Sequence, residues 1–365
     1  MATCPTVRDL HGAFEPNTAD GDSPSLFSTV PPHRDDPRQV PSPPEPAARR
    51  VGIARLAALS PQADAKRGAE YFLLPAQSIL NRCDSERVPF PWTVNPYRGC
   101  EFGCHYCFAR YTHEFMELDG SEFESKIFVK RDAGGLAARD LLSKGLRGEH
   151  IAIGAATDPY QPAEKEFGAT RAVLEEMARR RGLSVSITTK SNLIVRDIEL
   201  LKRIAERSSL RVNMTITTLR MGLARLLEPR APRPDLRIAA LRALRDAGIE
   251  AGVLAMPILP WLTDRPDDLD ALARAVKEAG ALWFAGNVLY LMPTPRRQFF
   301  AFLEKKFPRL VRRYAEWYAR TGNAPESYSR EIGRRVAELR DKYGLAARLP
   351  ISQPAEGQAS QLRLF

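Results

Sequence analysis

The sequence predicts an α/β fold built on a parallel sheet. Short β-rich segments alternate with helical segments, glycine follows several of the helices, and 44% of the residues are hydrophobic, enough for a sizeable core. The predicted strands are residues 93–97, 151–157, 184–189, 211–217, 251–256 and 282–289, and the predicted helices between them include residues 170–181, 197–207, 236–247 and 266–279. Six strand–helix alternations indicate right-handed crossovers, and they leave both an open doubly wound sheet and a partial barrel possible.

Glycine marks the ends of three of these helices. Gly182, Gly248 and Gly280 each follow a helical segment directly. Glycine adopts the left-handed conformation at low cost, which is the conformation that ends many helices. The helix boundaries are therefore predicted at these three positions.

A further helix is predicted over residues 305–320. Its large apolar residues recur at helical spacing and would face the core: Phe307, Leu310, Val311, Tyr314, Trp317 and Tyr318. Its basic residues would lie mostly outside: Lys305, Lys306, Arg309, Arg312, Arg313 and Arg320. From the sequence alone, we favour a solvated amphipathic helix over a nucleic-acid surface.

Both ends of the chain differ from the segment between them. Residues 1–65 contain a stretch rich in Pro, Arg and Asp with few large apolar groups, which predicts a disordered tail. Residues 66–300 form the predicted core with an N-terminal extension, and residues 301–345 a C-terminal helical segment. Residues 346–365 are predicted to be a flexible tail that ends in QLRLF.

The overall charge weakly favours a polyanionic partner. The chain has 54 Lys and Arg residues against 44 Asp and Glu, a net charge of +10. An arginine-rich span offers candidate phosphate contacts, although solvated helix faces and ion pairs explain it equally well: Arg220, Arg230, Arg233, Arg237, Arg242 and Arg245. We find no secretory signal and no apolar run of the length of a membrane span, so we expect a cytoplasmic protein without a membrane partner.

Three of the five cysteines lie within eight residues. The segment TVNPYRGCEFGCHYCFAR places Cys100, Cys104 and Cys107 directly after the first predicted strand. Thiolates are the usual ligands of iron–sulfur clusters, and three of them can hold three irons of a cube and leave the fourth open. Gly99 and Gly103 allow the backbone to wrap closely, and Tyr106 supplies an aromatic wall. The sequence therefore predicts a metal site at this loop.

Two other interpretations of the cysteines stay open at this point. A zinc ion could use the three thiolates with His105 or His113 as its fourth ligand, although structural zinc sites usually occur as paired knuckles. Three cysteines without a ligand are the other alternative, which the polar, glycine-rich loop disfavours.

This cysteine spacing resembles the signature of radical S-adenosylmethionine (SAM) enzymes. Further motifs resemble, in the same order, a bacterial DNA repair photolyase-like group related to spore photoproduct lyase: NPYRGC, CHYCFAR, ATDPYQPAEKEF, ITTKS, NMTITT, LEPRAPRPDLRIAALRALRDAGI and PILPWLTD. The resemblance spans most of residues 66–344. It implies a partial (β/α)6 barrel of the TIM type with C-terminal helices, and a [4Fe–4S] cluster on Cys100, Cys104 and Cys107.

The resemblance also implies where SAM binds. Matching motifs assign SAM contacts to Tyr106, Thr157, Asp158, Lys190, Asn213 and Thr215. An Asp can accept from the ammonium of SAM, a Lys can pair with its carboxylate, and hydroxyls can bond its ribose. Ordinary alternatives exist for these residues, since an Asp before Pro159 is common in turns and a Lys can be solvated.

The implied activity is reductive cleavage of SAM to a 5′-deoxyadenosyl radical that abstracts hydrogen from a substrate. It implies a one-electron donor of the flavodoxin or ferredoxin type. Spore photoproduct lyase is expected to carry a hydrogen-donating cysteine near the end of its second strand, whereas Ala155 and Ala156 stand there in this chain. We therefore do not expect that particular lyase activity.

Three functions remain under consideration. The leading hypothesis is a radical SAM enzyme acting on damaged nucleic acid, that is, DNA repair. The second keeps the chemistry but changes the substrate to a protein, a tRNA or a metabolite. The third is a non-catalytic iron–sulfur or zinc protein that binds DNA or senses redox state.

The last five residues suggest a protein partner. Gln361, Leu362, Arg363, Leu364 and Phe365 resemble the Gln-Leu-x-Leu-Phe peptide that docks bacterial replication and repair proteins on the DNA sliding clamp. Leu364 and Phe365 can anchor such a peptide in an apolar pocket. The alternative is that this terminus folds back onto the barrel.

Overall fold

The computed structural model describes residues 50–66, 68–83, 90–143, 146 and 148–347. Its larger sheet has seven strands in the order β11-β10-β9-β8-β7-β4-β3. In chain order these are β3 (Leu80–Arg82), β4 (Trp92–Val94), β7 (His150–Ile153), β8 (Ser184–Thr189), β9 (Ser209–Thr215), β10 (Ala251–Ile258) and β11 (Phe284–Val288). Six of them pair in parallel, and β3 alone is antiparallel. The predicted α/β fold with a parallel sheet is confirmed.

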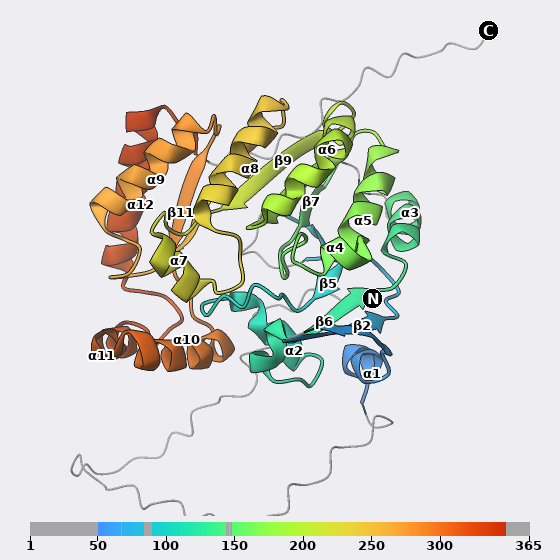
Figure 1. The fold of residues 1–365 in the computed structure, drawn as a ribbon, viewed down its shortest axis with the longest axis horizontal. Helices are drawn as coiled ribbons and strands as arrows, with labels where there is room; N and C mark the ends of the chain where they lie inside the picture. The colour runs from blue at the N-terminus through green and yellow to red at the C-terminus, as the bar shows by residue number, and fades with distance from the viewer. Residues whose placement is uncertain (1–49, 67, 84–89, 144–145, 147, 348–365) are drawn as a thin grey trace, which may run out of the picture.

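The sheet is open rather than a closed barrel within the described residues, because β11 and β3 are its two edges. Helices cover its outer face: α3 (Ala133–Ser143), α5 (Ala169–Ala178), α6 (Ile198–Ala205), α8 (Pro234–Asp246) and α9 (Pro266–Glu278). Figure 1 shows them as a layer around the strands. The helix ends predicted at Gly248 and Gly280 are confirmed, since these glycines follow α8 and α9 with φ of +79° and +80°. The end predicted at Gly182 is wrong, because α5 already ends at Ala178 with Arg179 as its C-cap.

A second, smaller sheet lies beside the first. It has the order β1-β2-β6-β5 and consists of β1 (Gln62–Lys66), β2 (Ala69–Leu74), β5 (Tyr97–Arg98) and β6 (Lys126–Lys130). The first predicted strand, residues 93–97, is in fact split between the two sheets, with β4 in one and β5 in the other. Pro96 stands in the break, where its lack of an N–H interrupts a ladder.

The predicted tail is corrected at its C-terminal end. Helix α1 (Gly52–Ala58) and strand β1 form where the composition predicts disorder up to residue 65. Ala57 packs with Leu74, Met116 and Phe128 in a small separate core, so the burial comes from partners distant in sequence. Residues 1–49 of the predicted tail, including Cys4, lie outside the described residues.

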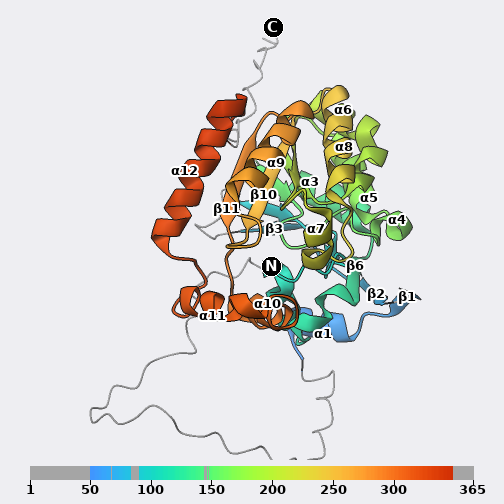
Figure 2. The ribbon, with the colours of Figure 1, turned by 60° about the vertical axis from the view of Figure 1, so that its left-hand side comes forward.

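The C-terminal part contains three helices, α10 (Pro293–Lys306), α11 (Pro308–Trp317) and α12 (Glu326–Tyr343). The single predicted helix over residues 305–320 is wrong, because α10 ends before Phe307 and Pro308 begins α11. Tyr314 and Tyr318 are fully buried, as predicted. Figures 1 and 2 both show α10 and α11 below the larger sheet, while α12 lies along α9 and β11.

Shorter helical segments complete the description: η3 (Phe108–Arg110), α2 (Tyr111–Glu114), η4 (Gly120–Glu124), α4 (Glu164–Phe167), η5 (Asn192–Asp197) and α7 (Met221–Leu227). In the part of the chain that the structure describes, no helix combines the length and apolarity needed to cross a membrane. Most of the predicted C-terminal tail, including the QLRLF peptide, lies outside the described residues.

The packing of β10 against the Trp283 ring depends on the absence of a side chain at Gly252. A Cβ at Gly252 would lie 2.3 Å from Cδ2 of the buried Trp283 ring. We predict that Gly252→Ala lowers the free energy of unfolding by about 1–3 kcal/mol, because the indole has to move within a packed core. Urea unfolding followed by tryptophan fluorescence measures the change.

Gly222→Ala is the matched control. Gly222 is in helix α7, and a Cβ there meets nothing within 4 Å. Alanine favours a helix over glycine by up to about 1 kcal/mol, so this variant should be unchanged or more stable. Equal destabilisation of both variants would contradict the packing argument.

Candidate active site

The three clustered cysteines lie on a loop between the two sheets. Cys100, Cys104 and Cys107 are all free thiols. Gly99 and Gly103 have φ of +82° and +63°, so the loop turns through left-handed backbone at both positions. A Cβ at Gly99 would lie 2.7 Å from the Lys126 carbonyl oxygen, which shows how closely the loop packs on the second sheet. Glycine is required at that position.

The thiols share one cavity of about 400 Å³ with the ends of the strands. Its wall includes the three cysteines, Tyr106, Gly154, Ala155, Ala156, Thr157, Asp158, Thr188, Thr189, Lys190, Thr215, Met256, Leu289 and Tyr290. Apart from the cysteines and Tyr106, these residues lie near or after the C-terminal ends of β7, β8, β9, β10 and β11. The C-terminal ends of parallel strands are where the active sites of such α/β folds lie.

Thr157 and Gln161 hold the cysteine loop from the β7 side. The Gly99 carbonyl accepts from Oγ1 of Thr157 at 2.6 Å and from Nε2 of Gln161 at 3.1 Å. Oε1 of Gln161 accepts from the Glu101 N–H at 3.0 Å. Both side chains are buried, so the loop backbone on either side of Cys100 has its polar groups paired with protein.

Asp158 joins the ends of β7 and β8. Its carboxylate accepts from Oγ1 of Thr189 at 2.6 Å, from the Lys190 N–H at 2.7 Å and from the Tyr160 N–H at 2.9 Å. Burial raises the pKa of Asp158, although these three donors favour its ionised form. A carboxylate has about four acceptor positions, so one remains for a ligand.

A buried network fixes Tyr106, the residue before the third cysteine. Its hydroxyl contacts Oγ1 of Thr217 at 3.1 Å and donates to Glu228. Glu228 also accepts from Thr217 at 2.6 Å and forms an ion pair with Arg237. Burial alone would raise the pKa of Glu228, but the charges of Arg237 and Lys190 outweigh it and lower the pKa to about 2.

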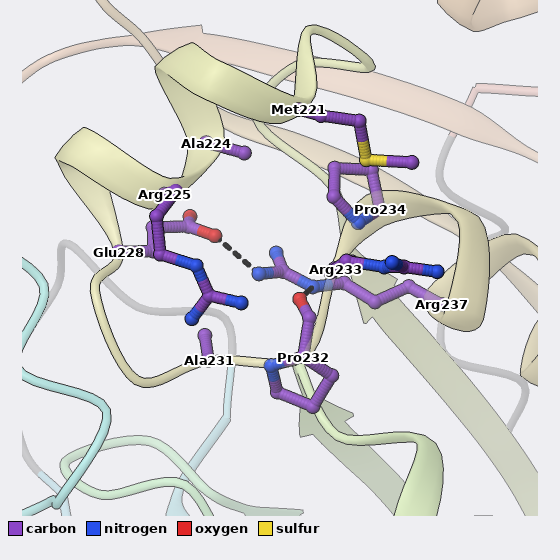
Figure 3. Close-up of a pocket in the computed structure, with 9 residues that line it drawn as sticks. All are labelled: Met221, Ala224, Arg225, Glu228, Ala231, Pro232, Arg233, Pro234 and Arg237. Carbon is purple, nitrogen blue, oxygen red and sulfur yellow. Dashed lines mark hydrogen bonds and ion pairs between the residues drawn. The ribbon is translucent and has the colours of Figure 1, made fainter.

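Figure 3 shows this ion pair from the side of a second, smaller cavity. That cavity has a volume of about 40 Å³ and is lined by α7, the residues after it and the start of α8. Such a volume holds water molecules but no larger ligand. The Glu228–Arg237 pair therefore serves the main cavity as a support, with Arg237 also donating to the Thr215 carbonyl at 3.1 Å.

Lys190 contributes the positive charge of the cavity wall. Its Nζ lies 5.8 Å from the centre of the Tyr106 ring. Burial lowers the pKa of Lys190, but its Coulombic interactions with the Cys104 sulfur and the Glu228 carboxylate outweigh burial and bring the pKa above its ordinary value. The side chain is thus a cation that faces the same cavity as the thiols.

The donor set fits an iron–sulfur cluster. Burial raises the pKa of the Cys100 thiol and raises that of Cys104 to about 12, so both carry protons until a metal replaces them. Three thiols on one cavity wall can each bind a different iron of a [4Fe–4S] cube. Within the described residues, no three His, Cys, Asp or Glu side chains are arranged to hold a single metal ion.

The two histidines of the zinc alternative are engaged elsewhere. The His105 ring stacks on Phe302, with centres 4.4 Å apart, and the Nε2 atom of His113 lies 3.0 Å from the Lys126 carbonyl oxygen. Burial lowers the pKa of both rings, that of His113 to about 4. Neither ring lines the cavity, so the zinc interpretation gains no support.

The structure brings together all but one of the residues that the sequence assigns to the site. Tyr106, Thr157, Asp158, Lys190, Thr215 and the three cysteines line one cavity. Asn213 does not: its amide accepts from the Trp283 indole at 3.2 Å and donates to Thr188 at 3.4 Å, below the cavity. Cys83 also lies away from the cavity wall, and Ala155 and Ala156 line it.

Sequence reasoning missed Gln161, Glu228 and the role of Arg237. Arg237 is a candidate phosphate contact from the sequence, but the fold buries it against Glu228, which corrects that interpretation. Other arginines of the same span are also engaged: Arg230 with the Gly68 carbonyl, Arg233 with Asp235 and Arg245 with the Gly280 carbonyl. The signal available was the presence of acidic residues, Glu228 and Asp235, in a basic segment, LEPRAPRPDLR.

The family of the chain follows from these features and from comparison with known proteins. The family model described as Radical SAM superfamily matches residues 94–289, from β4 through β11. The chain therefore belongs to the radical SAM superfamily. It is 35% identical over 303 residues to an uncharacterised protein of Mycobacterium tuberculosis strain H37Rv, covering 82% of this chain and 88% of the relative.

Further proteins resemble the chain in sequence or in fold. An uncharacterised protein of Methanocaldococcus jannaschii is 34% identical over 173 residues, covering 47% of this chain and 62% of the relative. Among solved structures, a spore photoproduct lyase mutant with bound AdoMet and dinucleoside spore photoproduct has a TM-score of 0.53 at 13% identity, covering 74% and 78% of the two chains. Another mutant of that lyase has a TM-score of 0.51, with 84% of each chain covered. These likenesses show a shared fold.

Iron binding should depend on the loop cysteines. We predict that anaerobic reconstitution of the wild-type chain yields about four irons per chain and a brown protein, and that Cys104→Ala loses most of this iron. Cys83→Ala is the matched control, since Cys83 is free and buried but does not line the cavity. A colourless wild-type protein that takes up only zinc would contradict the cluster assignment.

The Glu228–Arg237 pair should be essential for stability. We predict that Glu228→Gln lowers the free energy of unfolding by about 3–5 kcal/mol, because it leaves the Arg237 guanidinium buried without a counter-charge. The double variant Glu228→Gln/Arg237→Met should recover part of this loss, and urea unfolding of both single variants, Glu228→Gln and Arg237→Met, and of the double variant gives the coupling. A single variant within about 1 kcal/mol of wild type would contradict the assigned role.

Proposed function

We propose that the chain is a radical SAM enzyme that reductively cleaves SAM and abstracts hydrogen from a nucleic-acid substrate. One observation carries the proposal: three free thiols, a buried carboxylate and a lysine line a single cavity at the C-terminal ends of the parallel strands. Thiols suit an iron–sulfur cluster, and the carboxylate and the lysine suit the ammonium and the carboxylate of an amino acid.

We assign the cluster to Cys100, Cys104 and Cys107. When bound, the [4Fe–4S] cluster and SAM supply one-electron cleavage of the sulfur–C5′ bond, which yields methionine and a 5′-deoxyadenosyl radical. The protein holds the loop rigid through the Gly99 carbonyl and the Tyr106 hydroxyl, each bonded to side chains from the neighbouring strand ends. A preorganised site of this kind needs little rearrangement when its ligands bind.

We assign SAM contacts to Tyr106, Thr157, Asp158, Lys190 and Thr215. The unused acceptor position of Asp158 suits the ammonium, and the Lys190 cation suits the carboxylate. The hydroxyl of Thr157 already donates to Gly99, so it reaches a ligand only as an acceptor. The expected contact at Asn213 stays a prediction that its position below the cavity does not support.

The substrate proposal is supported by charge and by fold. The net charge of +10 favours a polyanion, and the spore photoproduct lyase structure of similar fold contains a dinucleoside spore photoproduct. Ala155 and Ala156 line the cavity where that lyase is expected to carry its hydrogen-donating cysteine, so we propose a different reaction on a nucleic acid. The structure offers no comparable support for a protein or metabolite substrate.

The cellular setting is also proposed. The family chemistry requires a one-electron donor, and we propose a flavodoxin or ferredoxin. Free thiols at a metal site suit a reducing compartment, so we propose that the protein is cytoplasmic. The sliding-clamp peptide at residues 361–365 rests on the sequence alone and stays a prediction.

SAM cleavage tests the proposed function. The reconstituted protein with dithionite and SAM should form 5′-deoxyadenosine under anaerobic conditions. Lys190→Gln should keep its iron but lower kcat/KM for SAM about tenfold or more, since it removes a charged hydrogen-bond donor. Chromatography of 5′-deoxyadenosine and iron analysis measure the two effects.

Two negative results would refute different parts of the proposal. Iron-loaded protein that forms no 5′-deoxyadenosine with dithionite, with flavodoxin or with added DNA would overturn the enzymatic proposal and favour a non-catalytic cluster protein. Unchanged SAM kinetics in Lys190→Gln would refute only the assigned lysine contact.

A further inference from the structure

The positive charge of the chain is concentrated in one short segment. Residues 293–320, which form α10 and α11, contain eight Lys or Arg residues and two Glu residues, a net charge of +6. The whole chain has a net charge of +10. More than half of the excess charge therefore belongs to this segment, which consists of the two helices and the residues directly after α11.

The inner face of these helices packs in the core that contains the cysteine loop. Phe299, Phe302 and Leu303 of α10 belong to the same buried core as Cys100 and Cys104. On α11, the hydroxyl of Tyr314 donates to the Pro260 carbonyl at 2.7 Å, and that of Tyr318 donates to the Leu289 carbonyl at 3.0 Å. Because Leu289 lines the cavity, α11 is fixed at the cavity's edge.

The outer face carries a group of exposed cations, which we call the basic ridge: Lys305, Lys306, Arg309, Arg313 and Arg320. Among the described residues, Lys305, Lys306, Arg309 and Arg320 have no ion-pair partner, and the Arg313 guanidinium lies over the Trp261 ring, 5.5 Å from its centre. Their charges are therefore not neutralised by the part of the fold that the structure describes.

Helix α12, by contrast, pairs several of its arginines with acidic residues of the same helix. Arg330 pairs with Glu326, Arg334 with Glu338, and Arg335 with Glu331, all one helical turn apart. On α11, only Arg312 has such a partner, Glu316 at 2.9 Å. A solvated amphipathic helix, the interpretation that the sequence favours for this segment, would be expected to resemble α12.

Aromatic rings lie beside the ridge. Trp261 follows β10 in the left-handed conformation, with φ of +60°, and is partly buried. Trp317 packs against it at 4.2 Å between ring centres. Strained backbone in a large residue is uncommon and concentrates at functional sites. Cations interleaved with aromatic rings are the combination that binds single-stranded nucleic acids, through phosphates and stacked bases.

The cavity is too small to contain a stretch of nucleic acid, so most of the phosphates of such a ligand would lie outside it. About 400 Å³ admits a ligand the size of a small molecule or a nucleoside but not a double helix. A nucleic acid can therefore present only one or two nucleotides to the thiols, while its flanking backbone stays at the rim. The hydrogen bond from Tyr318, directly after α11, to the carbonyl of Leu289 in the cavity wall brings the end of this helix close to that rim.

We propose that the basic ridge on α10 and α11 binds the sugar–phosphate backbone of a nucleic acid whose reacting nucleotide enters the cysteine-lined cavity. This inference rests on the proposed function for its substrate, but the ridge itself can bind without turnover. The ligand is recognised by its regularly spaced phosphates and its stacking bases.

The test compares two triple variants of the full chain. Lys305→Gln/Lys306→Gln/Arg309→Gln removes three unpaired charges from the ridge. Arg181→Gln/Arg203→Gln/Arg207→Gln removes three exposed charges close before β8 and β9 begin, at the end of the sheet opposite the cavity. Both change the net charge equally, so a difference between them reports position.

Fluorescence anisotropy with fluorescein-labelled 20-nucleotide single-stranded and duplex DNA, at several salt concentrations, measures binding. The ridge variant should bind at least about tenfold more weakly than wild type at 0.1 M salt, with a salt slope lower by about two to three. The control variant should bind within about threefold of wild type. Circular dichroism and urea midpoints establish that both variants are folded.

Several outcomes would overturn the proposal. They are a ridge variant that binds DNA as the wild type does, a control variant that loses as much affinity, and a wild-type chain that binds vesicles with 30% phosphatidylserine but neither form of DNA. The 5′-deoxyadenosine assay separates this inference from the proposed function. SAM cleavage without DNA binding refutes the ridge alone, and ridge-dependent DNA binding without SAM cleavage refutes the enzymatic proposal alone.

Discussion

The cysteine loop depends on one buried carboxylate, that of Glu228. It bonds Tyr106 of the loop, Thr217 beyond the end of β9 and Arg237 of α8, so three separate segments meet at two oxygen atoms. A charge so deeply buried is tolerated only because Arg237 and the hydroxyl groups surround it. Through Arg237, the same network reaches the carbonyl of Thr215, which lines the cavity. The position of the thiols is thereby tied to the main sheet.

The second support acts from the opposite side of the loop. Thr157 and Gln161 bind the Gly99 carbonyl, and the missing Cβ of Gly99 lets the loop approach the Lys126 carbonyl of the second sheet. Because the loop is anchored to both sheets, its three thiols lie at one cavity without a bound metal to hold them there. This anchoring requires buried polar groups, which are stable only while each of them keeps its hydrogen-bond partner.

Sequence periodicity was sufficient for the main sheet and insufficient for the second one. Strands such as β8 are continuous runs of apolar and β-branched residues because helices or loops cover both faces, and the glycines after the helices are local signals. Strand β1 is exposed along its length and gains its order from pairing with β2, which no local pattern records. The break at Pro308 was locally visible, but the helical spacing of apolar residues continued across it and concealed it.

The residues of the candidate site also fall into two groups, those that the sequence predicts and those that only the structure identifies. Cysteine spacing and strand ends predict Cys100, Asp158 and Lys190 because each is the polar end of a recognisable local pattern. Asn213 lies on the same face of β9 as Thr215, but it comes two residues before the strand ends, and its amide meets Trp283 instead. Glu228 lies beyond the end of β9 on a connecting segment, and its role depends on contacts with residues 122 positions away and 9 positions away. Such a support can be inferred only from three-dimensional structure.

The two faces of α10 and α11 connect stability with recognition. Their inner aromatic residues pack in the same buried core as Cys100 and Cys104, so displacing the helices would disturb the cysteine loop. Their outer charges repel one another and do not stabilise the isolated chain, since an uncompensated cluster of like charges destabilises a fold. A partner of opposite charge would remove this repulsion. In the proposed complex, the phosphates of a nucleic acid would supply that charge.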